Sequence, residues 1–398
     1  MKAAYTLQQL FEQRLEAIAQ HYRQGDLSLG YRRLMDAALD TGDTRLFDAV
    51  TAHTEWLETE ARGDAEQWEK AAALLEQIGA AGVQAHKTVG EEIMTAQQIR
   101  KTYSGGNFSL GPVDIRLRRG ELLGLVGENG NGKTTLLRVL ASELQHDAGT
   151  IDYHLPQSSN PYDLRSQLAY IPQRTPKWFG PLKDNLKFTL SSYGIKGAAN
   201  ESYVLMYIAR MGLWKYRHLD WSQLSSGYKM RFELARTFLR RPDILLLDEP
   251  LANLDVLAQQ TILEDLKTLS DSLSAPMAVV LSSQQLYEVE KVSDKVLFLK
   301  SGQPMWQDNA TATGTDAAAA EAAGLIVEFD TDAGREQLQS AFAHLPLEKI
   351  NFNGGTYVAH FLAPGTMPEV LSALGNAGIS VVYIRNISKS TRRFFVTA

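Results

Sequence analysis

The sequence predicts an α/β fold in several domains: an N-terminal all-helical domain over residues 1–92, a central α/β domain over 93–308 and a small α+β domain over 325–398. Apolar residues recur at three- and four-residue steps in the first segment, which is typical of helices. Strand-like and helix-like runs alternate in the central segment, and the last segment reads strand, helix, strand, strand, helix, strand. A chain of 398 residues is long enough for two or three domains of about 100–200 residues.

The composition is typical of a globular protein of the cytoplasm. The chain is 44% hydrophobic and 22% charged, and no apolar run approaches the ~20 residues that cross a bilayer or resembles a signal peptide. The absence of cysteine excludes disulfides and thiolate metal sites. The net charge of −6 is uneven, because residues 1–94 hold 9 Lys and Arg against 16 Asp and Glu. This acidic first domain argues against nucleic acid or anionic lipid as its direct partner.

The helical periodicity of the first domain is clearest near its start. The apolar residues that share one helix face there are Leu7, Leu10, Phe11, Leu15, Ile18 and Tyr22. Asp26, Asp43 and Asp64 occupy positions typical of helix N-caps, and the segment 79–82 (Gly-Ala-Ala-Gly) is expected to break the last helix. We interpret the apolar stripes as the core of a helical bundle; a groove for a protein partner is the alternative.

The central domain has five clear strand candidates and is predicted to form a largely parallel sheet. They cover residues 122–126, 168–171, 244–247, 277–282 and 295–299. Residues 309–323 consist mostly of small side chains, so 309–324 is interpreted as a linker or a short exposed helix.

The last domain has the element order of a split βαβ unit, which predicts a ferredoxin-like fold. The expected elements are strands at 325–329, 350–352, 357–362 and 379–384 and helices at 333–344 and 368–377. Nothing in this segment resembles a catalytic constellation.

A glycine-rich loop follows the first strand of the central domain. Its sequence, Gly127-Glu-Asn-Gly-Asn-Gly-Lys133-Thr134, follows the strand at 122–126, and residues 135–141 continue as a helix. Such a turn directs several backbone N–H groups at a phosphate, while the lysine reaches the terminal phosphates and the threonine hydroxyl binds Mg²⁺. The loop therefore predicts a nucleoside triphosphate site.

Two further motifs in the central domain fit phosphate chemistry. The apolar strand at 244–247 ends in Asp248 and Glu249. Asp248 can hold Mg²⁺ through water, and Glu249 can orient or deprotonate the water that attacks a γ-phosphate. Ser225 and Gly227 stand just before a helix, where a hydroxyl and free amides can bind a second set of phosphate oxygens.

With these motifs the central domain resembles the nucleotide-binding domain of ATP-binding cassette (ABC) proteins over about 210 residues. The resemblance implies three sets of site residues. The nucleotide ligands would be Tyr103, stacked on adenine, Gly127, Asn129, Gly130, Gly132, Lys133, Thr134, Thr135, Gln173, Ser225 and Gly227. Thr134, Gln173 and Asp248 would bind Mg²⁺, and Glu249, Lys133 and Gln284 would act in catalysis. The segment Asn253-Leu-Asp255 matches the loop that crosses to a second subunit.

The sequence departs from the family pattern at two places. The signature Leu-Ser-Gly-Gly-Gln is changed at Ser226 and Tyr228, although Ser225 and Gly227 are retained. Gln284 stands where the family has a histidine that bonds the γ-phosphate and holds the attacking water. The glutamine amide can donate a hydrogen bond, but it cannot take up a further proton and become positively charged as histidine can, so we expect a slow ATPase.

The resemblance implies a head-to-tail homodimer that holds two ATP molecules and uses ATP and Mg²⁺ as its cofactors. We expect the ATPase subunit of an ABC transporter, of the exporter type, attached to the inner face of the membrane through separate transmembrane subunits. The N-terminal domain could receive a regulatory or scaffold protein. The alternatives are a soluble ABC ATPase that works without a membrane partner and a non-catalytic, ATP-gated assembly protein.

Overall fold

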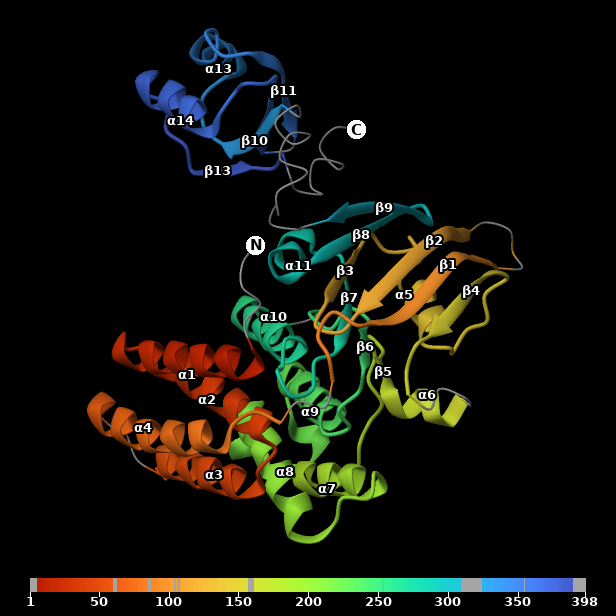
Figure 1. Ribbon diagram of the computed structural model, residues 1–398. Coiled ribbons are helices and arrows are strands. Elements are labelled where there is room, and N and C mark those ends of the chain that lie inside the picture. Colours follow the sequence, from red (N-terminus) through yellow and green to blue (C-terminus); the bar gives the residue numbers. More distant parts are fainter. Residues whose placement is uncertain are drawn as a thin grey trace. The chain divides into compact units, whose positions relative to one another are not determined.

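The computed structural model describes residues 6–59, 63–84, 87–103, 105, 108–156, 161–252, 254–308, 324–353 and 355–388 (Figure 1). The chain forms two compact units. The first holds residues 1–284 and 299–304, and the second holds 285–298 and 305–398. The predicted linker at 309–324 lies outside the described residues, apart from Gly324.

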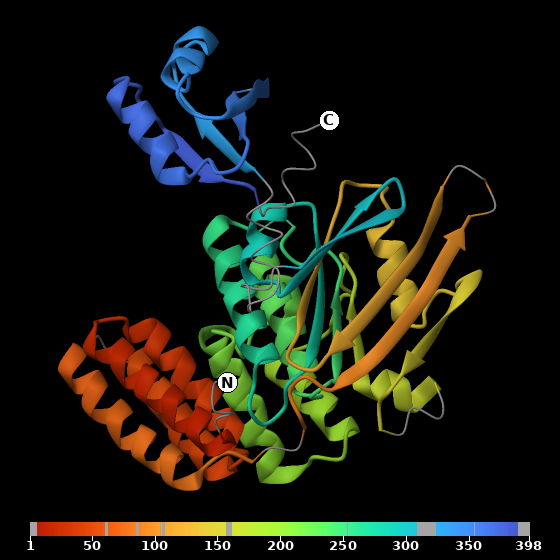
Figure 2. The ribbon, with the colours of Figure 1, turned by 45° about the horizontal axis from the view of Figure 1, so that its top comes forward.

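The chain begins with helices packed side by side, as the periodicity predicts (Figures 1 and 2). They are α1 (Leu7–Arg23), α2 (Leu27–Thr41), α3 (Thr44–Thr59) and α4 (Asp64–Ala81). Phe11 and Leu34 in these helices are fully buried. The predicted helical bundle core is therefore confirmed.

Two details of these helices differ from the prediction. Asp64 is the first residue of α4, and Gly63 in an extended conformation is its N-cap, so the predicted cap at Asp64 is wrong by one position. An acidic residue in the first turn still interacts favourably with the helix dipole. The helix also continues through Gly79 and ends only at Gly82, whose φ of 69° suits glycine.

The central domain contains a parallel sheet whose strands were predicted. Strands β5 (Leu168–Ile171), β6 (Ile244–Leu247) and β3 (Leu122–Val126) have the predicted bounds, and β7 (Ala278–Ser283) starts and ends one residue later. The strand order is β5-β6-β7-β3-β8-β9, with β8 at Lys295–Lys300 and β9 at Gln303–Asp308. Of the residues in these last two strands, 299–300 and 303–304 belong to the first unit. Because β5, β6, β7 and β3 are parallel, their carboxyl ends meet at one edge.

A second, antiparallel sheet in this domain was not predicted. Its order is β2-β1-β4, made of β1 (Glu92–Thr102), β2 (Ser109–Arg118) and β4 (Ala148–Tyr153). The pairing of β1 shifts register between Ala96 and Ile99, where Gln98 has a φ of 53°. This irregularity interrupts the two-residue alternation by which a strand is recognised in sequence.

Helices surround the parallel sheet and carry the remaining motifs (Figure 2). They are α5 (Lys133–Leu140), α6 (Pro161–Gln167), α7 (Leu182–Ser192), α8 (Gly197–Arg210), α9 (Ser226–Phe238) and α10 (Val256–Ser270), with short 3-10 turns η1 (Trp214–Tyr216) and η2 (Trp221–Gln223).

The N-terminal helices pack on α8 and α10 of the central domain. Phe47 of α3 meets Tyr203 of α8 edge to face, with ring centroids 5.0 Å apart. The guanidinium of Arg210, which is fully buried, pairs with Asp36 at 2.5 Å and Asp265 at 2.7 Å. This ion cluster connects the N-terminal domain to two different helices of the central domain.

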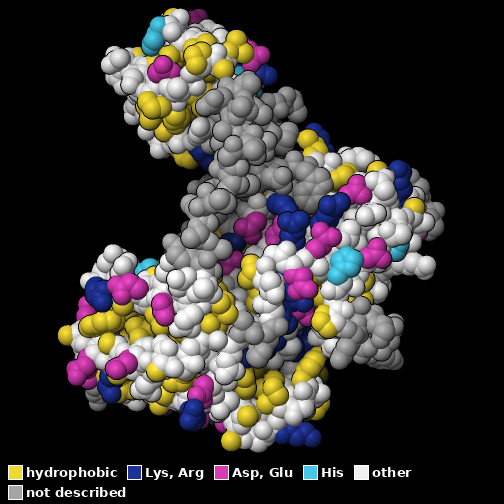
Figure 3. Space-filling model, in the orientation of Figure 1, with side chains coloured by type: hydrophobic (Ala, Val, Ile, Leu, Met, Phe, Trp, Pro, Cys, Tyr) yellow, Lys and Arg dark blue, Asp and Glu magenta, His cyan; other side chains and the backbone are white. Residues whose placement is uncertain are grey.

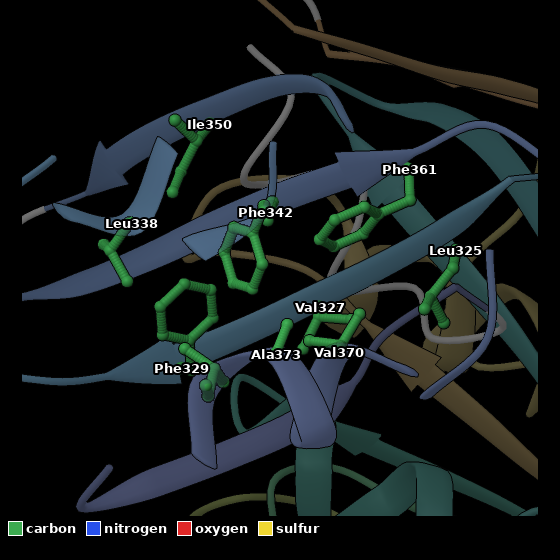
Figure 4. Packing of buried hydrophobic residues seen from close by; sticks show 11 residues of the cluster. Leu325, Val327, Phe329, Leu338, Phe342, Ile350, Phe361, Val370 and Ala373 are labelled. Atoms are coloured by element: carbon green, nitrogen blue, oxygen red, sulfur yellow. The ribbon is translucent and has the colours of Figure 1, made fainter. Parts of the chain in front are cut away.

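The second unit contains α11 (Leu286–Val292) and the C-terminal elements β10 (Leu325–Asp330), α13 (Arg335–Ala341), β11 (Leu347–Asn353), β12 (Thr356–Phe361), α14 (Met367–Asn376) and β13 (Tyr383–Asn386). The sheet order is β11-β12-β10-β13, and each neighbouring pair is antiparallel. The rings of Phe329, Phe342 and Phe361 meet in the core of this unit (Figure 4).

The last predicted strand starts later than expected. Residues 379–384 were predicted to be extended, but β13 begins at Tyr383. The amide of Ile379 donates to the Leu374 carbonyl, and Gly378 has a φ of 63°. These residues therefore cap the end of α14 rather than pair in the sheet.

Candidate nucleotide-binding site

The glycine-rich loop after β3 is folded around the Lys133 side chain. The Lys133 ammonium donates to the carbonyls of Gly127, at 2.7 Å, and Glu128, at 3.2 Å, and the side chain is 4% exposed. Gly132, with a φ of 97°, is the N-cap of α5. A Cβ on Gly127 would lie 2.5 Å from the Leu299 carbonyl oxygen, so the close passage of the loop over β8 requires glycine there.

The beginning of α5 presents polar side chains beside this loop. Thr134 is exposed in the first turn of the helix, and Asn129 and Gly130 are exposed in the loop itself. The hydroxyl of Thr135 lies 3.2 Å from the Tyr103 hydroxyl, and Tyr103 is 44% exposed. The predicted adenine-stacking residue is therefore next to the phosphate loop.

The structure brings three of the predicted residues to the carboxylate of Glu249. The Lys133 ammonium lies 3.1 Å from this carboxylate. The side-chain amides of Gln173 and Gln284 donate to it at 3.2 Å and 2.9 Å. These groups come from the segments that follow β3, β5 and β7, with Lys133 the first residue of α5, so the meeting point is the carboxyl edge of the sheet.

Asp248 is held beside Glu249 by groups that the sequence analysis did not identify. The Ser282 hydroxyl donates to one carboxylate oxygen of Asp248 at 2.8 Å, and the Tyr170 hydroxyl donates to the other at 3.4 Å. Burial and the charge of Asp248 raise the pKa of Tyr170. A polar residue inside an otherwise apolar strand, as Ser282 is in β7, is the signal that could have revealed it.

Asn131 is a second residue that the sequence analysis missed. Its side-chain oxygen accepts a hydrogen bond of 2.9 Å from the backbone of Ser301. Ser301 follows β8, so this bond fixes the phosphate loop to the next strand of the sheet. The role of Asn131 depends on Ser301, which is distant in the sequence, and no local sequence motif indicates this contact.

The signature segment lies at the start of α9. Ser225 is exposed and is the N-cap of the helix, with its hydroxyl accepting from the Tyr228 amide at 3.5 Å. The ring of Tyr228 packs on Tyr216 with centroids 4.1 Å apart, and the hydrogen bond between their hydroxyls raises the pKa of Tyr228. Ser225 and Gly227 thus lie at the N-terminal end of a helix, where backbone amides can bind an anion.

The loop that was expected to cross to a second subunit is partly described. Asp255 is the N-cap of α10, and its carboxylate accepts from the Ala258 amide at 2.9 Å. Asn253 lies outside the described residues.

The oxygen donors of the site fit Mg²⁺. Thr134 supplies a hydroxyl and Asp248 a carboxylate, and Mg²⁺ is usually held by one or two protein oxygens together with substrate phosphates and waters. No group of three or more His, Cys, Asp or Glu side chains suited to a metal occurs in the described part of the chain. A hydroxyl and a single carboxylate are donors that suit a metal also held by nucleotide phosphates.

Residues 110–252 match the sequence profile of the ABC transporter family. The central domain is an ABC nucleotide-binding domain. The matched residues include the phosphate loop, the signature segment and both carboxylates at the end of β6.

Two curated relatives show the extent of the similarity. The spermidine/putrescine import ATP-binding protein PotA of Mesoplasma florum is 30% identical over 217 residues, which is 53% of this chain and 59% of the relative. The sulfate/thiosulfate import ATP-binding protein CysA of Vibrio cholerae is 30% identical over 206 residues, covering 50% of this chain and 54% of the relative. The chain thus spans between half and three fifths of the length of these relatives.

A solved structure shows the same fold. CbiO1 from Clostridium perfringens, described as part of the ABC transporter complex cbiONQ, aligns with a TM-score of 0.51 at 21% identity. The alignment covers 64% of this chain and 96% of CbiO1. In this chain, no helix in the described segments is both long enough and apolar enough to cross a membrane.

Proposed function

We propose that this chain is the ATP-binding and ATP-hydrolysing subunit of an ABC transporter. The observation that carries the proposal is the convergence of Lys133, Gln173 and Gln284 on the carboxylate of Glu249. A lysine inside a glycine-rich loop serves the phosphates, and a carboxylate beside it serves the attacking water. Other P-loop activities share the loop, but the signature at Ser225 and the glutamine at 173 favour the cassette.

Each site residue has a separate role in the proposed ATP hydrolysis. The loop amides from Gly127 to Thr134 and the Lys133 ammonium bind the β- and γ-phosphates. Thr134, Asp248 and Gln173 would hold Mg²⁺, which neutralises charge on the phosphates when it is bound. Glu249 orients the water or accepts its proton.

Gln284 makes this reaction slow in our proposal. Its amide donates to Glu249 at 2.9 Å and can turn to a phosphate oxygen, but it brings no positive charge. The loss of one charge-assisted hydrogen bond in the transition state, about 1.5–3 kcal/mol, slows turnover by tens to hundreds of times. Hydrolysis is retained, because Lys133, Asp248 and Glu249 are all present.

The active form is a head-to-tail homodimer in this proposal. Ser225, which is exposed at the N-cap of α9, and Gly227 in the first turn offer a hydroxyl and backbone amides that can bind phosphate oxygens. In a dimer each would face the Lys133 loop of the other copy, with ATP between them. Cleavage of ATP then removes the contact and opens the dimer.

The chain would work at the inner face of the membrane, docked to separate transmembrane subunits. The support is that relatives such as PotA and CysA are named as import ATP-binding proteins. The exporter direction that we expected from the sequence has no support from these names. We therefore restrict the proposal to transport without a direction.

We propose a ferredoxin-like fold for the C-terminal domain. The support is the element order βαββαβ with the strand order β11-β12-β10-β13. The division into domains at 1–92, 93–308, 309–324 and 325–398 is likewise our proposal.

For the N-terminal domain, we propose a regulatory or scaffold protein as the partner. Figure 3 shows acidic and basic side chains interspersed on one face of the described residues.

Two experiments test the proposal. The purified chain should hydrolyse ATP with a requirement for Mg²⁺, and Glu249→Gln should remove the activity. Purification of the tagged chain from detergent extracts should recover a multi-span membrane protein as its main partner. Recovery of a soluble partner in place of a membrane protein would contradict the transport function but not the ATPase activity.

A further inference from the structure

Asp248 is held by a hydroxyl group from each neighbouring strand of the sheet. Strand β6, which ends at Leu247, lies between β5 and β7. The Ser282 hydroxyl of β7 donates to one oxygen of the Asp248 carboxylate at 2.8 Å, and the Tyr170 hydroxyl of β5 donates to the other at 3.4 Å. The carboxylate that would bind Mg²⁺ is thus restrained from both sides.

Ser282 makes a second hydrogen bond, and this one reaches Glu249. The Ser282 oxygen accepts from the Glu249 backbone amide at 2.9 Å. Glu249 has a φ of 49°, in the left-handed region that non-glycine residues seldom adopt. The hydroxyl of Ser282 therefore holds the orientation of Asp248 and the backbone conformation of Glu249 together.

The environment makes these bonds effective. Ser282 is fully buried and Asp248 is 3% exposed, so water cannot replace the hydroxyl at low cost. A hydrogen bond donated to an ionised carboxylate is stronger than one between neutral groups. Each carboxylate oxygen accepts one of these two hydrogen bonds and keeps a further lone pair for a ligand.

We propose that Ser282 is a positioning residue for metal-bound nucleotide, with Tyr170 in a lesser role at its longer distance. The inference rests on the proposed ATPase function. Ser282 acts through Asp248 and Glu249 and does not itself contact the nucleotide. Partners of this kind typically change metal affinity by about 10–100-fold when they are removed.

The test compares ATP affinity with Mg²⁺ and with EDTA in the same preparation of the full chain. In the Ser282→Ala variant, affinity with Mg²⁺ should fall about tenfold more than affinity with EDTA, because only the former depends on Asp248. The ratio of the two affinities cancels any loss of folded protein. Ser270→Ala is the matched control, since Ser270 is also fully buried and its hydroxyl donates to the Lys267 carbonyl away from the site.

A second pair of variants examines the other side of Asp248. Tyr170→Phe should lower the Mg²⁺-to-EDTA affinity ratio by about two- to threefold, in line with its weaker bond. Tyr153→Phe should leave the ratio unchanged, because its hydroxyl donates to the Leu140 carbonyl at 2.8 Å.

The outcomes separate the inference from the proposed function. Equal affinity losses with Mg²⁺ and with EDTA in Ser282→Ala, or a ratio like that of the control, would overturn the positioning role. A wild-type chain that binds ATP no better with Mg²⁺ than with EDTA, or does not bind it, would instead refute the proposed function. Restoration of the ratio by Ser282→Thr, which keeps a hydroxyl, would support the role of that group.

Discussion

The carboxylate of Glu249 lies 3.1 Å from the ammonium of Lys133, and both side chains are at most 10% exposed. In this arrangement the group proposed to act on water is paired with the group proposed to bind the γ-phosphate. An incoming triphosphate must therefore take Lys133 from Glu249. The side-chain amides of Gln173 and Gln284 donate hydrogen bonds to Glu249. These bonds can keep the carboxylate in place when Lys133 moves from Glu249 to the phosphate.

Because of this pairing, we predict that Glu249→Gln strengthens ATP binding but slows ATP turnover. Removal of the negative charge frees Lys133 and reduces repulsion of the triphosphate, so ATP affinity should rise about tenfold. Turnover should fall by at least about a hundredfold, because the amide cannot accept a proton. Equilibrium binding of a fluorescent ATP analogue and a phosphate-release assay measure the two effects.

Glu128→Gln is the matched control for that experiment. It removes the same charge from the exposed part of the phosphate loop, where the backbone of Glu128, not its side chain, contacts Lys133. Turnover should then stay within about threefold of the wild type. If Glu249→Gln leaves turnover intact, Glu249 has no role in hydrolysis.

Gln284→His should increase the rate of hydrolysis. A histidine can donate to the γ-phosphate with partial positive charge, and recovery of such a contact corresponds to about 1.5–3 kcal/mol in the barrier. We expect kcat to rise roughly tenfold or more, with little change in KM for ATP. Gln285→His, at the neighbouring exposed position, is the control. An unchanged kcat would show that position 284 does not limit the rate.

The Arg210 cluster predicts a large loss of stability. Arg210 is fully buried between Asp36 and Asp265, so Arg210→Ala removes the buried cation from two carboxylates. Each then keeps only a longer contact with a partly exposed arginine, at 3.3 Å for Asp36 and 3.8 Å for Asp265. We expect a loss of about 3–5 kcal/mol in the free energy of unfolding by urea. Lys215→Ala breaks the Glu58 pair of a side chain that is 70% exposed and should cost less than about 1 kcal/mol. Similar small losses in both variants would contradict the account of the N-terminal docking.

His53 predicts a pH dependence of stability. The ring is 6% exposed between Tyr31 and Trp56, and burial lowers the pKa of His53 to about 4. The unfolded chain, with a pKa near 6.5, binds more protons than the folded one between these values. Stability should therefore be complete above about pH 6.5 and fall by the order of 1 kcal/mol as pH approaches 4.

The pH effect of His53 is isolated by comparison of two substitutions. His53→Gln should flatten this part of the curve of unfolding free energy against pH, relative to His218→Gln at an exposed position. Curves of the same shape for the two variants would show that His53 does not titrate in this way.

The sequence allowed the parallel strands and the residues at their ends to be predicted, because both are local patterns. Strands β3, β5 and β6 are continuous apolar runs, and parallel packing alone brings Gln173, Glu249 and Gln284 to the same edge. The antiparallel sheet was missed because the irregularity at Gln98 breaks the alternation of β1. The roles of Ser282 and Asn131 depend on partners that are distant in the chain, and no spacing rule specifies such contacts.

The most direct test of the central claim is ATP binding and turnover of the Lys133→Ala variant in the presence of Mg²⁺. The lysine makes charge-assisted contacts in the loop that we assign to the phosphates, so we predict a loss of at least about tenfold in ATP affinity and no measurable turnover. ATP-dependent self-association, followed by light scattering, should disappear with it. Unchanged affinity, turnover and self-association in Lys133→Ala would contradict the assignment of this loop as the nucleotide site.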